Sequence, residues 1–197
     1  MAHPTFAALA LGSLAACGAA LGLPACARHA HADAPDDREA LQYQAYRQPQ
    51  KMVAGLTLTP GQRVADVGAG RGLVTTRIAD AVGPRGHVVA LDIDGTALAA
   101  IPRRATIETR VVAADEPALE PAAYDRILLA EVDHLLPDRA VYLGKLMRAL
   151  RPGGFIAVTN RVLYRAPLVS AATAAGLRAS EVPLDLPAHF FVRLEPR

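Results

Sequence analysis

Short apolar runs alternate with stretches of helical periodicity along the chain from residue 63 onwards. The apolar runs are typical of buried strands, whereas the stretches between them place apolar residues three or four positions apart. The expected strands are RVADV (63–67), HVVALD (87–92), RVVAAD (110–115), YDRILLAE (124–131) and FIAVTN (155–160). The expected helices are LVTTRIADAV (73–82), TALAAI (96–101), DRAVYLGKLMRAL (138–150) and PLVSAATAAG (167–176).

This alternation predicts an open α/β domain. Strands that are continuously apolar fit a sheet covered on both faces, and helices between successive strands imply right-handed parallel crossovers. The last two apolar stretches, RASEVP (178–183) and AHFFVRLE (188–195), have no helical period between them. We therefore expect a doubly wound, Rossmann-like, mostly parallel sheet with a C-terminal antiparallel hairpin.

The chain before residue 63 has a different pattern. Residues 6–27 are almost wholly Ala, Gly and Leu without charge, and the tripeptide AHA (30–32) offers a small-x-small cleavage site. Cys17 and Cys26 each end a stretch that resembles a lipoprotein signal. The absence of Lys and Arg from the first five residues, MAHPT, argues against an export leader.

These features divide the chain into three segments. We predict a signal peptide or lipoprotein-like leader over residues 1–32, a helical extension over 33–62 and the main domain over 63–197. A used leader would direct the protein to the cell envelope or periplasm, and an acylated one would tether it to a membrane. The alternative is a cytoplasmic protein.

Composition narrows the function. Of the 197 residues, 52% are hydrophobic and 20% are charged, with a formal net charge of +2, so the chain is a folded globule without the basic stripe of a nucleic-acid-binding protein. Both cysteines lie in the predicted leader, which excludes a disulfide or a thiolate nucleophile in the main domain. His29 and His31 have no carboxylate at ligand spacing, so we predict no metal site.

The segment VADVGAGRG (64–72) carries the clearest chemical signal. It joins an expected strand to an expected helix, where glycines allow the backbone to approach a ligand closely. Gly68, Gly70 and Gly72 are spaced GxGxG, whereas a dinucleotide fingerprint would need a glycine at Leu73. Asp66, just before the loop, would repel a pyrophosphate. The loop therefore favours a nucleoside-like ligand with a cationic amino-acid end.

These residues resemble the class I S-adenosylmethionine-dependent methyltransferases, over roughly residues 48–192. The loop is similar to the first motif of that family, and YDRILLAEVDHLL and LRPGGFIAV are similar to its later strands. The resemblance implies S-adenosylmethionine as cofactor, with Gly68, Gly70 and Gly72 passing under it and Asp66 near its methionine amino group.

Two further acids match positions of this family. Asp92 ends the next expected strand, and a carboxylate there can accept strong charge-assisted hydrogen bonds from both ribose hydroxyls. Asp115, at the end of RVVAAD, matches the residue that meets the adenine amino group, although an acid in that position can also cap the following helix.

More narrowly, the chain resembles a bacterial subgroup of small methyltransferases that often carry export leaders. The resemblance rests on QxP, LxLTPGQRVADVGAG, AVGPRGHVVALDID and the FFVRLE ending. Two departures affect the acceptor pocket. The subgroup commonly has an aromatic residue where Leu73 stands, and the stretch between the fifth strand and the hairpin is short here.

Candidate catalytic residues follow the fourth expected strand. Methyl transfer is a direct displacement, and orientation alone can contribute on the order of 7–11 kcal/mol. His134 is the best base if the acceptor is a hydroxyl or an acidic carbon; otherwise it is a polar residue at a loop edge. Glu131 is expected to line the methionine end of the cofactor. Arg161, Tyr164 and Arg165 form either a substrate lid or a surface loop, and we assign no chemistry to His189.

The sequence thus predicts a methyltransferase that uses S-adenosylmethionine and acts on a small-molecule substrate, with no nucleic acid partner. Two alternatives stay open. One is an NAD(P)-dependent oxidoreductase, against which Leu73 counts; the other is a non-catalytic S-adenosylmethionine-binding relative. The methyl acceptor and the oligomeric state are not determined by the sequence.

Overall fold

The computed structural model describes residues 45–197, all of which fall in one compact unit, residues 37–197. The leader predicted over residues 1–32 lies outside the described residues. Residues 45–47 are helical and lead into the first complete helix. None of the described helices is both long enough and apolar enough to span a bilayer.

Strands and helices alternate through most of the described chain. The strands are β1 (Arg63–Val67), β2 (His87–Asp92), β3 (Ile107–Val111), β4 (Tyr124–Ala130), β5 (Leu150–Arg161), β6 (Leu177–Glu181) and β7 (His189–Pro196). The helices are α2 (Pro49–Gly55), α3 (Thr75–Val82), α4 (Gly95–Ala99), α5 (Arg139–Ala149) and α6 (Arg165–Ala174), with 3-10 turns η1 (Asp133–Leu135) and η2 (Val162–Tyr164).

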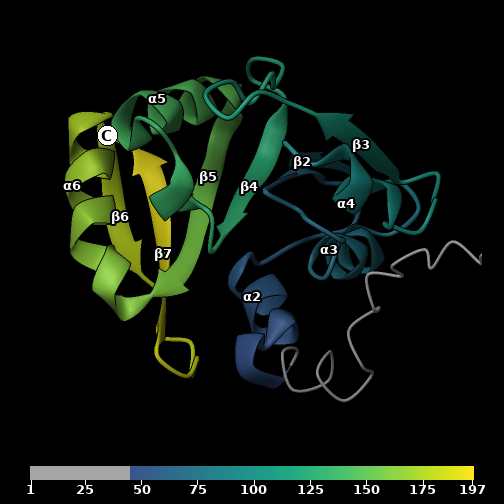
Figure 1. The fold of residues 1–197 in the computed structure, drawn as a ribbon, viewed down its shortest axis with the longest axis horizontal. Coiled ribbons are helices and arrows are strands. Elements are labelled where there is room, and N and C mark those ends of the chain that lie inside the picture. Colours follow the sequence, from purple (N-terminus) through teal and green to yellow (C-terminus); the bar gives the residue numbers. More distant parts are fainter. Residues whose placement is uncertain (1–44) are drawn as a thin grey trace, which may run out of the picture. The chain divides into compact units, whose positions relative to one another are not determined.

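The strands form one seven-stranded sheet in the order β3-β2-β1-β4-β5-β7-β6 (Figure 1). The five strands from β3 to β5 pair in parallel, and β7 pairs antiparallel with both β5 and β6. The predicted doubly wound sheet and C-terminal antiparallel hairpin are confirmed. Because β1 lies between β2 and β4, the chain reverses its direction of winding there, and this switch point is where such sheets bind ligands.

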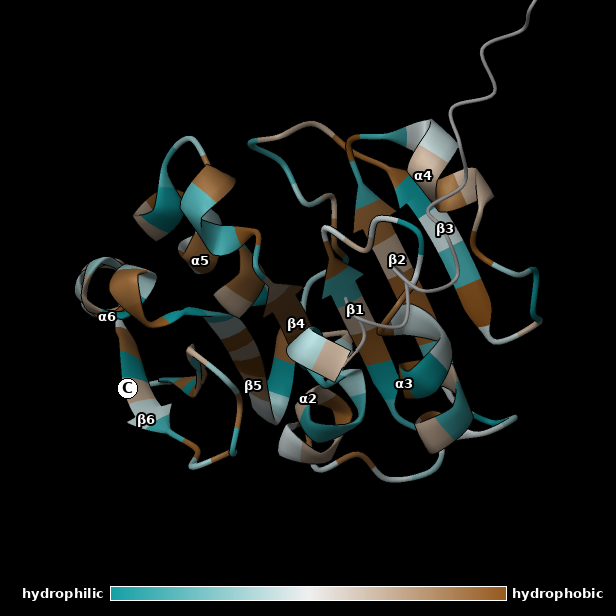
Figure 2. Cartoon of the chain, turned by 60° about the horizontal axis from the view of Figure 1, so that its bottom comes forward, coloured by the Kyte–Doolittle hydropathy of each residue, from teal (hydrophilic) through white to brown (hydrophobic). Residues whose placement is uncertain are grey.

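The apolar strands bury side chains on both faces of the sheet. Alternate residues of a strand point to opposite faces. Val64 and Leu128 therefore pack in the core with α2 and α3, whereas Ala65 and Ile127 pack in the core with α5 and α6. Figure 2 shows hydrophobic colours concentrated on the central strands. This burial holds the carboxyl ends of β1, β2, β4 and β5 at one edge.

Capping side chains fix where two of the helices begin. The Asp138 carboxylate accepts a hydrogen bond from the Val141 amide at 3.0 Å and caps the N-terminus of α5. Asp94 caps α4 in the same way, with hydrogen bonds from the amides of Thr96 and Ala97. The cap at Asp94 fixes the direction of the chain directly after Asp92, a predicted site residue.

Two predicted strand boundaries are wrong. The third strand occupies Ile107–Val111, not 110–115, because parallel pairing with β2 fixes its register and Val111 at its end is 62% exposed. The apolar residues after it form a loop. The fifth strand begins at Leu150, ahead of the predicted Phe155, because a register shift opposite Tyr124 and Arg126 accommodates the Pro152–Gly154 segment.

Candidate functional site

The glycine loop lies at the carboxyl end of β1, in the backbone conformation that glycine favours. Gly68, Gly70 and Gly72 have φ values of +72°, +52° and +80°. The amides of Gly68 and Ala69 donate to the Leu91 carbonyl at 2.8 and 2.9 Å, which ties the loop to β2. A Cβ at Gly68 would lie 2.4 Å from the Val132 side chain. The loop therefore needs glycine for conformation and for space.

Asp92 ends β2 directly beside this loop. Its Oδ2 accepts a hydrogen bond from the Gly70 amide at 2.7 Å, and its Oδ1 accepts one from the Asp94 amide at 3.0 Å. Each carboxylate oxygen has a second lone pair, so both can accept further hydrogen bonds. The structure thus brings the second predicted acid against the loop.

Asp66 lies in β1, and its side chain is buried. It is 2% exposed, and its Oδ2 accepts a hydrogen bond from the Thr75 hydroxyl at 2.6 Å. Burial raises the pKa of Asp66 to about 6, against the lowering effects of the Thr75 hydrogen bond and of Arg47. A cationic ligand group beside Asp66 would therefore stabilise its ionised form, and the attraction between the two charges would favour binding.

A hollow of about 200 Å³ opens beside Asp92 and Gly68. Its walls are mostly apolar, and Ile93 and Leu135 in its lining are 66% and 70% exposed. Two short, apolar residues, Ala113 and Ala114, line it from the loop after β3. A carboxylate at one side and apolar walls on the others match a nucleoside, which has a ribose and a flat base.

Asp115 lies just outside this hollow. It is exposed, and its backbone carbonyl accepts a hydrogen bond from the Lys145 ammonium at 2.7 Å. Tyr142 of α5, which was not a predicted site residue, also lines the hollow. Burial, followed by the charges of Glu116 and Asp115, raises the pKa of Tyr142 to about 12, so its hydroxyl stays protonated.

Glu131 follows β4 with an unusual backbone conformation for a non-glycine residue, φ +61°. Its Oε1 lies 2.9 Å from the Arg47 Nε and 3.1 Å from the His189 Nε2. Arg47 also donates to the Ala130 carbonyl at 3.2 Å and contributes to the electrostatics of Asp66. Such backbone strain is typical of functional sites.

Neither Arg47 nor His189 was a predicted site residue. His189 begins β7, and its Nδ1 lies 2.6 Å from the Pro187 carbonyl oxygen. Both residues are far from Glu131 in the sequence. The order of β4, β5 and β7 brings His189 to it, whereas Arg47 reaches it from the helical residues before α2. A histidine at the start of an otherwise apolar strand was the one available signal.

A second polar cluster lies at the ends of β4 and β5. Asn160 Nδ2 lies 2.6 Å from Asp133 Oδ1 and 2.9 Å from His134 Nδ1. The His134 ring stacks on Tyr164 at a centroid distance of 4.3 Å. Arg139 Nε donates to the Asp133 carbonyl at 2.9 Å. Burial raises the pKa of Asp133, opposed by the Asn160 hydrogen bond and by nearby Arg139.

The predicted catalytic residues thus belong to two neighbouring clusters. Glu131 is engaged by Arg47 and His189, whereas His134 is engaged by Asn160 and Tyr164. Asn160 was missed, although it is a polar residue at the end of an otherwise apolar strand. Within residues 45–197, no group of three His, Cys, Asp or Glu side chains is arranged to hold a metal ion.

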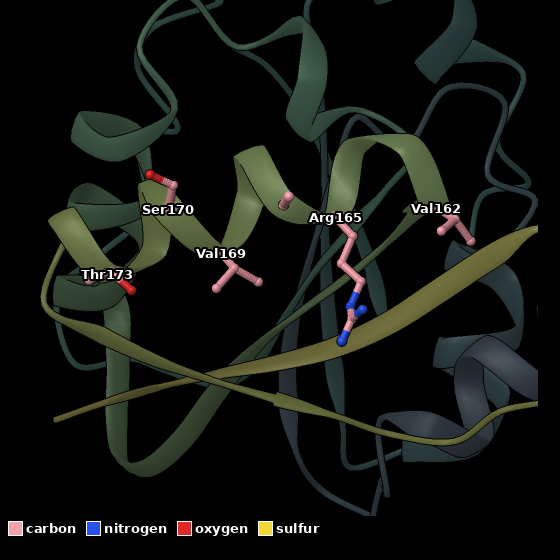
Figure 3. Close-up of a pocket in the computed structure, with 6 residues that line it drawn as sticks. Val162, Arg165, Val169, Ser170 and Thr173 are labelled. Carbon is pink, nitrogen blue, oxygen red and sulfur yellow. The ribbon is translucent and has the colours of Figure 1, made fainter.

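A second hollow, of about 570 Å³, lies along α6 (Figure 3), and its lining shares no residue with that of the hollow beside Gly68. Val162, Arg165, Val169 and Thr173 are among the residues that line it. The Arg165 side chain extends toward the C-terminal strands, where its guanidinium pairs with Glu181 of β6. This ion pair holds the Arg165 side chain at the surface, and we assign the hollow no role in the site at the ends of the parallel strands.

Comparison with known proteins agrees with this geometry. Residues 64–154 match a family model described as a methyltransferase domain. The chain is 31% identical over 173 residues to trans-aconitate 2-methyltransferase of Azoarcus sp. strain BH72, covering 82% of this chain and 67% of that protein. It is 33% identical over 109 residues to nocamycin O-methyltransferase of Saccharothrix syringae, covering 52% of this chain and 39% of that protein.

The fold is similar to that of a solved structure. A SAM-dependent methyltransferase from Aquifex aeolicus superposes with a TM-score of 0.70 at 20% sequence identity, covering 78% of this chain and 92% of that one. At this identity the similarity supports the fold alone.

Proposed function

Because this chain belongs to the S-adenosylmethionine-dependent methyltransferases, we propose that it methylates a small-molecule acceptor held between the glycine loop and the ends of β4 and β5. S-adenosylmethionine is its cofactor, and when bound it supplies a methyl group on a positively charged sulfur. The observation that carries the proposal is the apolar hollow bounded by Gly68 and Asp92. The acceptors named for two relatives, trans-aconitate and nocamycin, are small molecules.

The residues around the hollow fit the nucleoside half of this cofactor. Gly68, Gly70 and Gly72 leave the backbone open to it, and the Asp92 carboxylate accepts hydrogen bonds from the ribose hydroxyls. The exposed side chains of Ile93 and Leu135 cover the faces of the base, which removes apolar surface from water. We assign Asp115, just outside the hollow, to the adenine amino group.

The residues beyond the loop fit the methionine half. This part of the cofactor carries an ammonium and a carboxylate, so its site needs charges of both signs. Asp66 and Glu131 supply the negative charges, and Arg47 supplies a positive one within 2.9 Å of Glu131. In this proposal Glu131 and Arg47 would hold the amino-acid end of the cofactor, beside the second cluster, around His134.

We further propose that residues 1–32 direct the chain to the cell envelope, as in the subgroup with export leaders. The uncharged run over residues 6–27 and the AHA tripeptide support this proposal. The mass of the protein purified from its own cells tests it. A mass below 20.7 kDa, or one increased by acylation, is expected, and an unprocessed, unmodified chain of 20.7 kDa would exclude it.

Calorimetry with S-adenosylhomocysteine and the full chain tests the cofactor site. Asp92→Asn removes the charge that strengthens the ribose hydrogen bonds, so the affinity should fall about 10- to 100-fold. Asp185→Asn is the matched control, since the Asp185 side chain is 99% exposed and pairs with Lys51. Equal affinity of the Asp92→Asn variant and the wild type would remove Asp92 from the site.

Transfer of a labelled methyl group to small molecules of a cell extract tests the activity. Incorporation of label is expected, and it separates an enzyme from a non-catalytic relative that only binds the cofactor. A parallel NADH titration addresses the oxidoreductase alternative. Saturable NADH binding without binding of S-adenosylhomocysteine would overturn the proposed function.

A further inference from the structure

The side-chain amide of Asn160 has one orientation that satisfies its neighbours. Its Nδ2 lies 2.6 Å from Asp133 Oδ1 and 2.9 Å from His134 Nδ1, and its Oδ1 accepts a hydrogen bond from the backbone amide of Arg161 at 2.8 Å. In the flipped orientation the NH₂ group would face the Arg161 N–H, and two donors would meet. Asn160 is 1% exposed, so solvent does not relieve such a contact. Nδ2 is therefore the atom that faces Asp133 and His134.

Asp133 anchors this amide from the turn after β4. Its side chain is 0% exposed, and its Oδ1 accepts one of the two N–H groups of Asn160. Arg139, the first residue of α5, donates through Nε to the Asp133 carbonyl at 2.9 Å and lies 3.4 Å from Oδ2. Both the backbone and the side chain of Asp133 are thus held in place. The second N–H of Asn160 is directed at the His134 ring.

This N–H decides which nitrogen of His134 carries hydrogen. Because Asn160 Nδ2 is a donor, His134 Nδ1 must present its lone pair, and the neutral ring then carries its hydrogen on Nε2. A ring turned by 180° would face Asn160 with a carbon and leave that buried N–H unpaired. The stack on Tyr164, with an interplanar angle of 19°, fixes the plane of the ring.

The turn η1 places this ring between the cofactor hollow and the end of β5. Leu135 of the turn lines the hollow beside Gly68, whereas His134, the residue before it, packs on Tyr164 of η2, which follows β5. Since β4 lies between β1 and β5, consecutive side chains of one turn serve the two sides of the site. His134 Nε2 makes no hydrogen bond to any of residues 45–197 and is not enclosed by protein, so it is open to a ligand.

We infer that His134 binds the methyl acceptor as a hydrogen-bond donor, through Nε2–H, and that Asn160 and Asp133 are positioning residues that fix its tautomer. The inference rests on the proposed function. It differs from the role of a base, which the sequence left open for His134, because a ring nitrogen that already carries hydrogen takes no proton.

This role restricts the acceptor in one respect. The acceptor must present a lone pair on oxygen or nitrogen to Nε2–H, and this contact orients it for the displacement at the methyl carbon. The contact serves a neutral and an ionised nucleophile alike. His134 takes part in no proton transfer, so a proton released by a neutral nucleophile passes to solvent.

The tautomer is measured directly by ¹⁵N NMR of the full chain labelled at histidine, at about pH 8, where an ordinary histidine is neutral. His134→Gln identifies the His134 signals. In the wild type, Nε2 should carry the hydrogen and Nδ1 the lone pair. Asn160→Leu is similar in size and has no donor, so the fraction of rings protonated at Nδ1 should rise about fivefold, the ratio that one net hydrogen bond provides.

His87 is the internal control, because its ring contacts Glu108 and not Asn160, and its signals should not change. A wild-type His134 ring protonated at Nδ1, or an unchanged tautomer in Asn160→Leu, would overturn the assignment. If Asn160→Leu does not fold, the wild-type spectrum alone decides the tautomer. This readout does not depend on activity, so it stays separate from the test of the proposed function.

Two substitutions of His134 separate a hydrogen-bond donor from a base. His134→Phe keeps a ring that can stack on Tyr164 but has no nitrogen, whereas His134→Gln keeps an amide N–H and has no basic nitrogen. The probe is S-adenosylmethionine labelled at its methyl group, added with the small molecules of a cell extract. The initial rate of labelling should fall at least about tenfold in His134→Phe but only about threefold in His134→Gln, which still donates a hydrogen bond.

His87→Gln is the matched control and should label at the wild-type rate, since His87 lies in β2 and pairs with Glu108. Both His134 variants should bind S-adenosylhomocysteine as the wild type does, which calorimetry measures. Equal losses of rate in His134→Phe and His134→Gln would indicate a base and overturn the inference, as would full activity of His134→Phe. Absence of any transfer by the wild type would instead overturn the proposed function.

Discussion

The two halves of the candidate site are built differently. The cofactor half, around Gly68 and Asp92, uses backbone and side chains from two adjacent strand ends, and the hydrogen bonds between those ends join residues 22 or 23 positions apart. The acceptor half, around His134, uses Asn160, which is 26 positions away, and Glu131 nearby contacts Arg47 and His189. The hydrogen bonds of the first half therefore join strands that follow each other in the chain, whereas the second half also depends on contacts of Glu131 with residues far away in the sequence.

The largest expected effect lies in the cofactor half. In Gly68→Ala the new Cβ would lie 2.4 Å from Val132, and the residue would keep a positive φ. The clash and the strain together should reduce the free energy of unfolding by about 3 kcal/mol. Affinity for S-adenosylhomocysteine should fall at least about 100-fold. Urea unfolding and calorimetry measure the two effects.

Gly153→Ala is the matched control for this variant. Gly153 also has a positive φ, +77°, but a Cβ there meets nothing within 4 Å. Gly153→Ala should reduce the free energy of unfolding by the backbone strain alone, about 1 kcal/mol, and leave the affinity for S-adenosylhomocysteine unchanged. Equal destabilisation by the two substitutions would show that close approach to Val132 is unimportant to the loop.

The next effect is a pH-dependent one at Asp66. Its pKa is raised in the folded state from an ordinary 3.8 to about 6, mainly by burial, so the folded protein holds this proton more tightly than the unfolded chain does. Stability should therefore decrease as the pH rises from about 4 to about 6, and the loss should persist above that range.

Asp66→Asn removes this titration and retains an acceptor for the Thr75 hydroxyl. The variant should gain about 2 kcal/mol relative to the wild type between pH 4 and pH 7, while its affinity for S-adenosylhomocysteine falls. Urea unfolding at the two pH values measures the gain. Asp80→Asn, at an exposed position of α3, should show no such change. If the difference in free energy of unfolding between Asp66→Asn and the wild type were the same at pH 4 and pH 7, it would contradict the burial of the Asp66 charge.

A smaller effect is expected in the polar contacts of Glu131. The Arg47 and Glu131 side chains are 12% and 25% exposed, so a double-mutant cycle of Arg47→Met and Glu131→Gln should give a coupling of about 1 kcal/mol. The control pair, Arg178 and Glu195, is 68% and 38% exposed and should give less than about 0.5 kcal/mol. Equal couplings would mean that the first pair is only a surface contact.

The smallest effect separates two acids of the cofactor half. Asp115 is exposed and lies outside the hollow that Asp92 lines. Asp115→Ala should therefore weaken S-adenosylhomocysteine binding only about threefold, a fraction of the loss in Asp92→Asn, because an exposed hydrogen bond competes with water. A loss as large as that of Asp92→Asn would require the loop after β3 to close over the base.

Much of the fold could be predicted from the sequence, because the apolar residues that become buried recur with the spacing typical of a strand or a helix. The strands at Arg63–Val67 and His87–Asp92 match the structure at both ends. The two wrong boundaries lie where pairing overrides the local pattern. At β3 the register with β2 selects Ile107–Val111, and at β5 a shift in pairing lets the strand start before its glycines.

The sequence by itself determined the glycine loop and the acid that ends β2, because each depends on the conformation of a few consecutive residues. Only the tertiary structure decided that Arg47 and His189 meet at Glu131 and that Asn160 orients His134. Asn160 and His189 reach their partners because β4 lies beside β5 and β5 beside β7, whereas Arg47 reaches Glu131 from the helical residues before α2. Side-chain hydrogen bonds act over about 3 Å, so their partners are set by the packing of strands and not by distance along the chain.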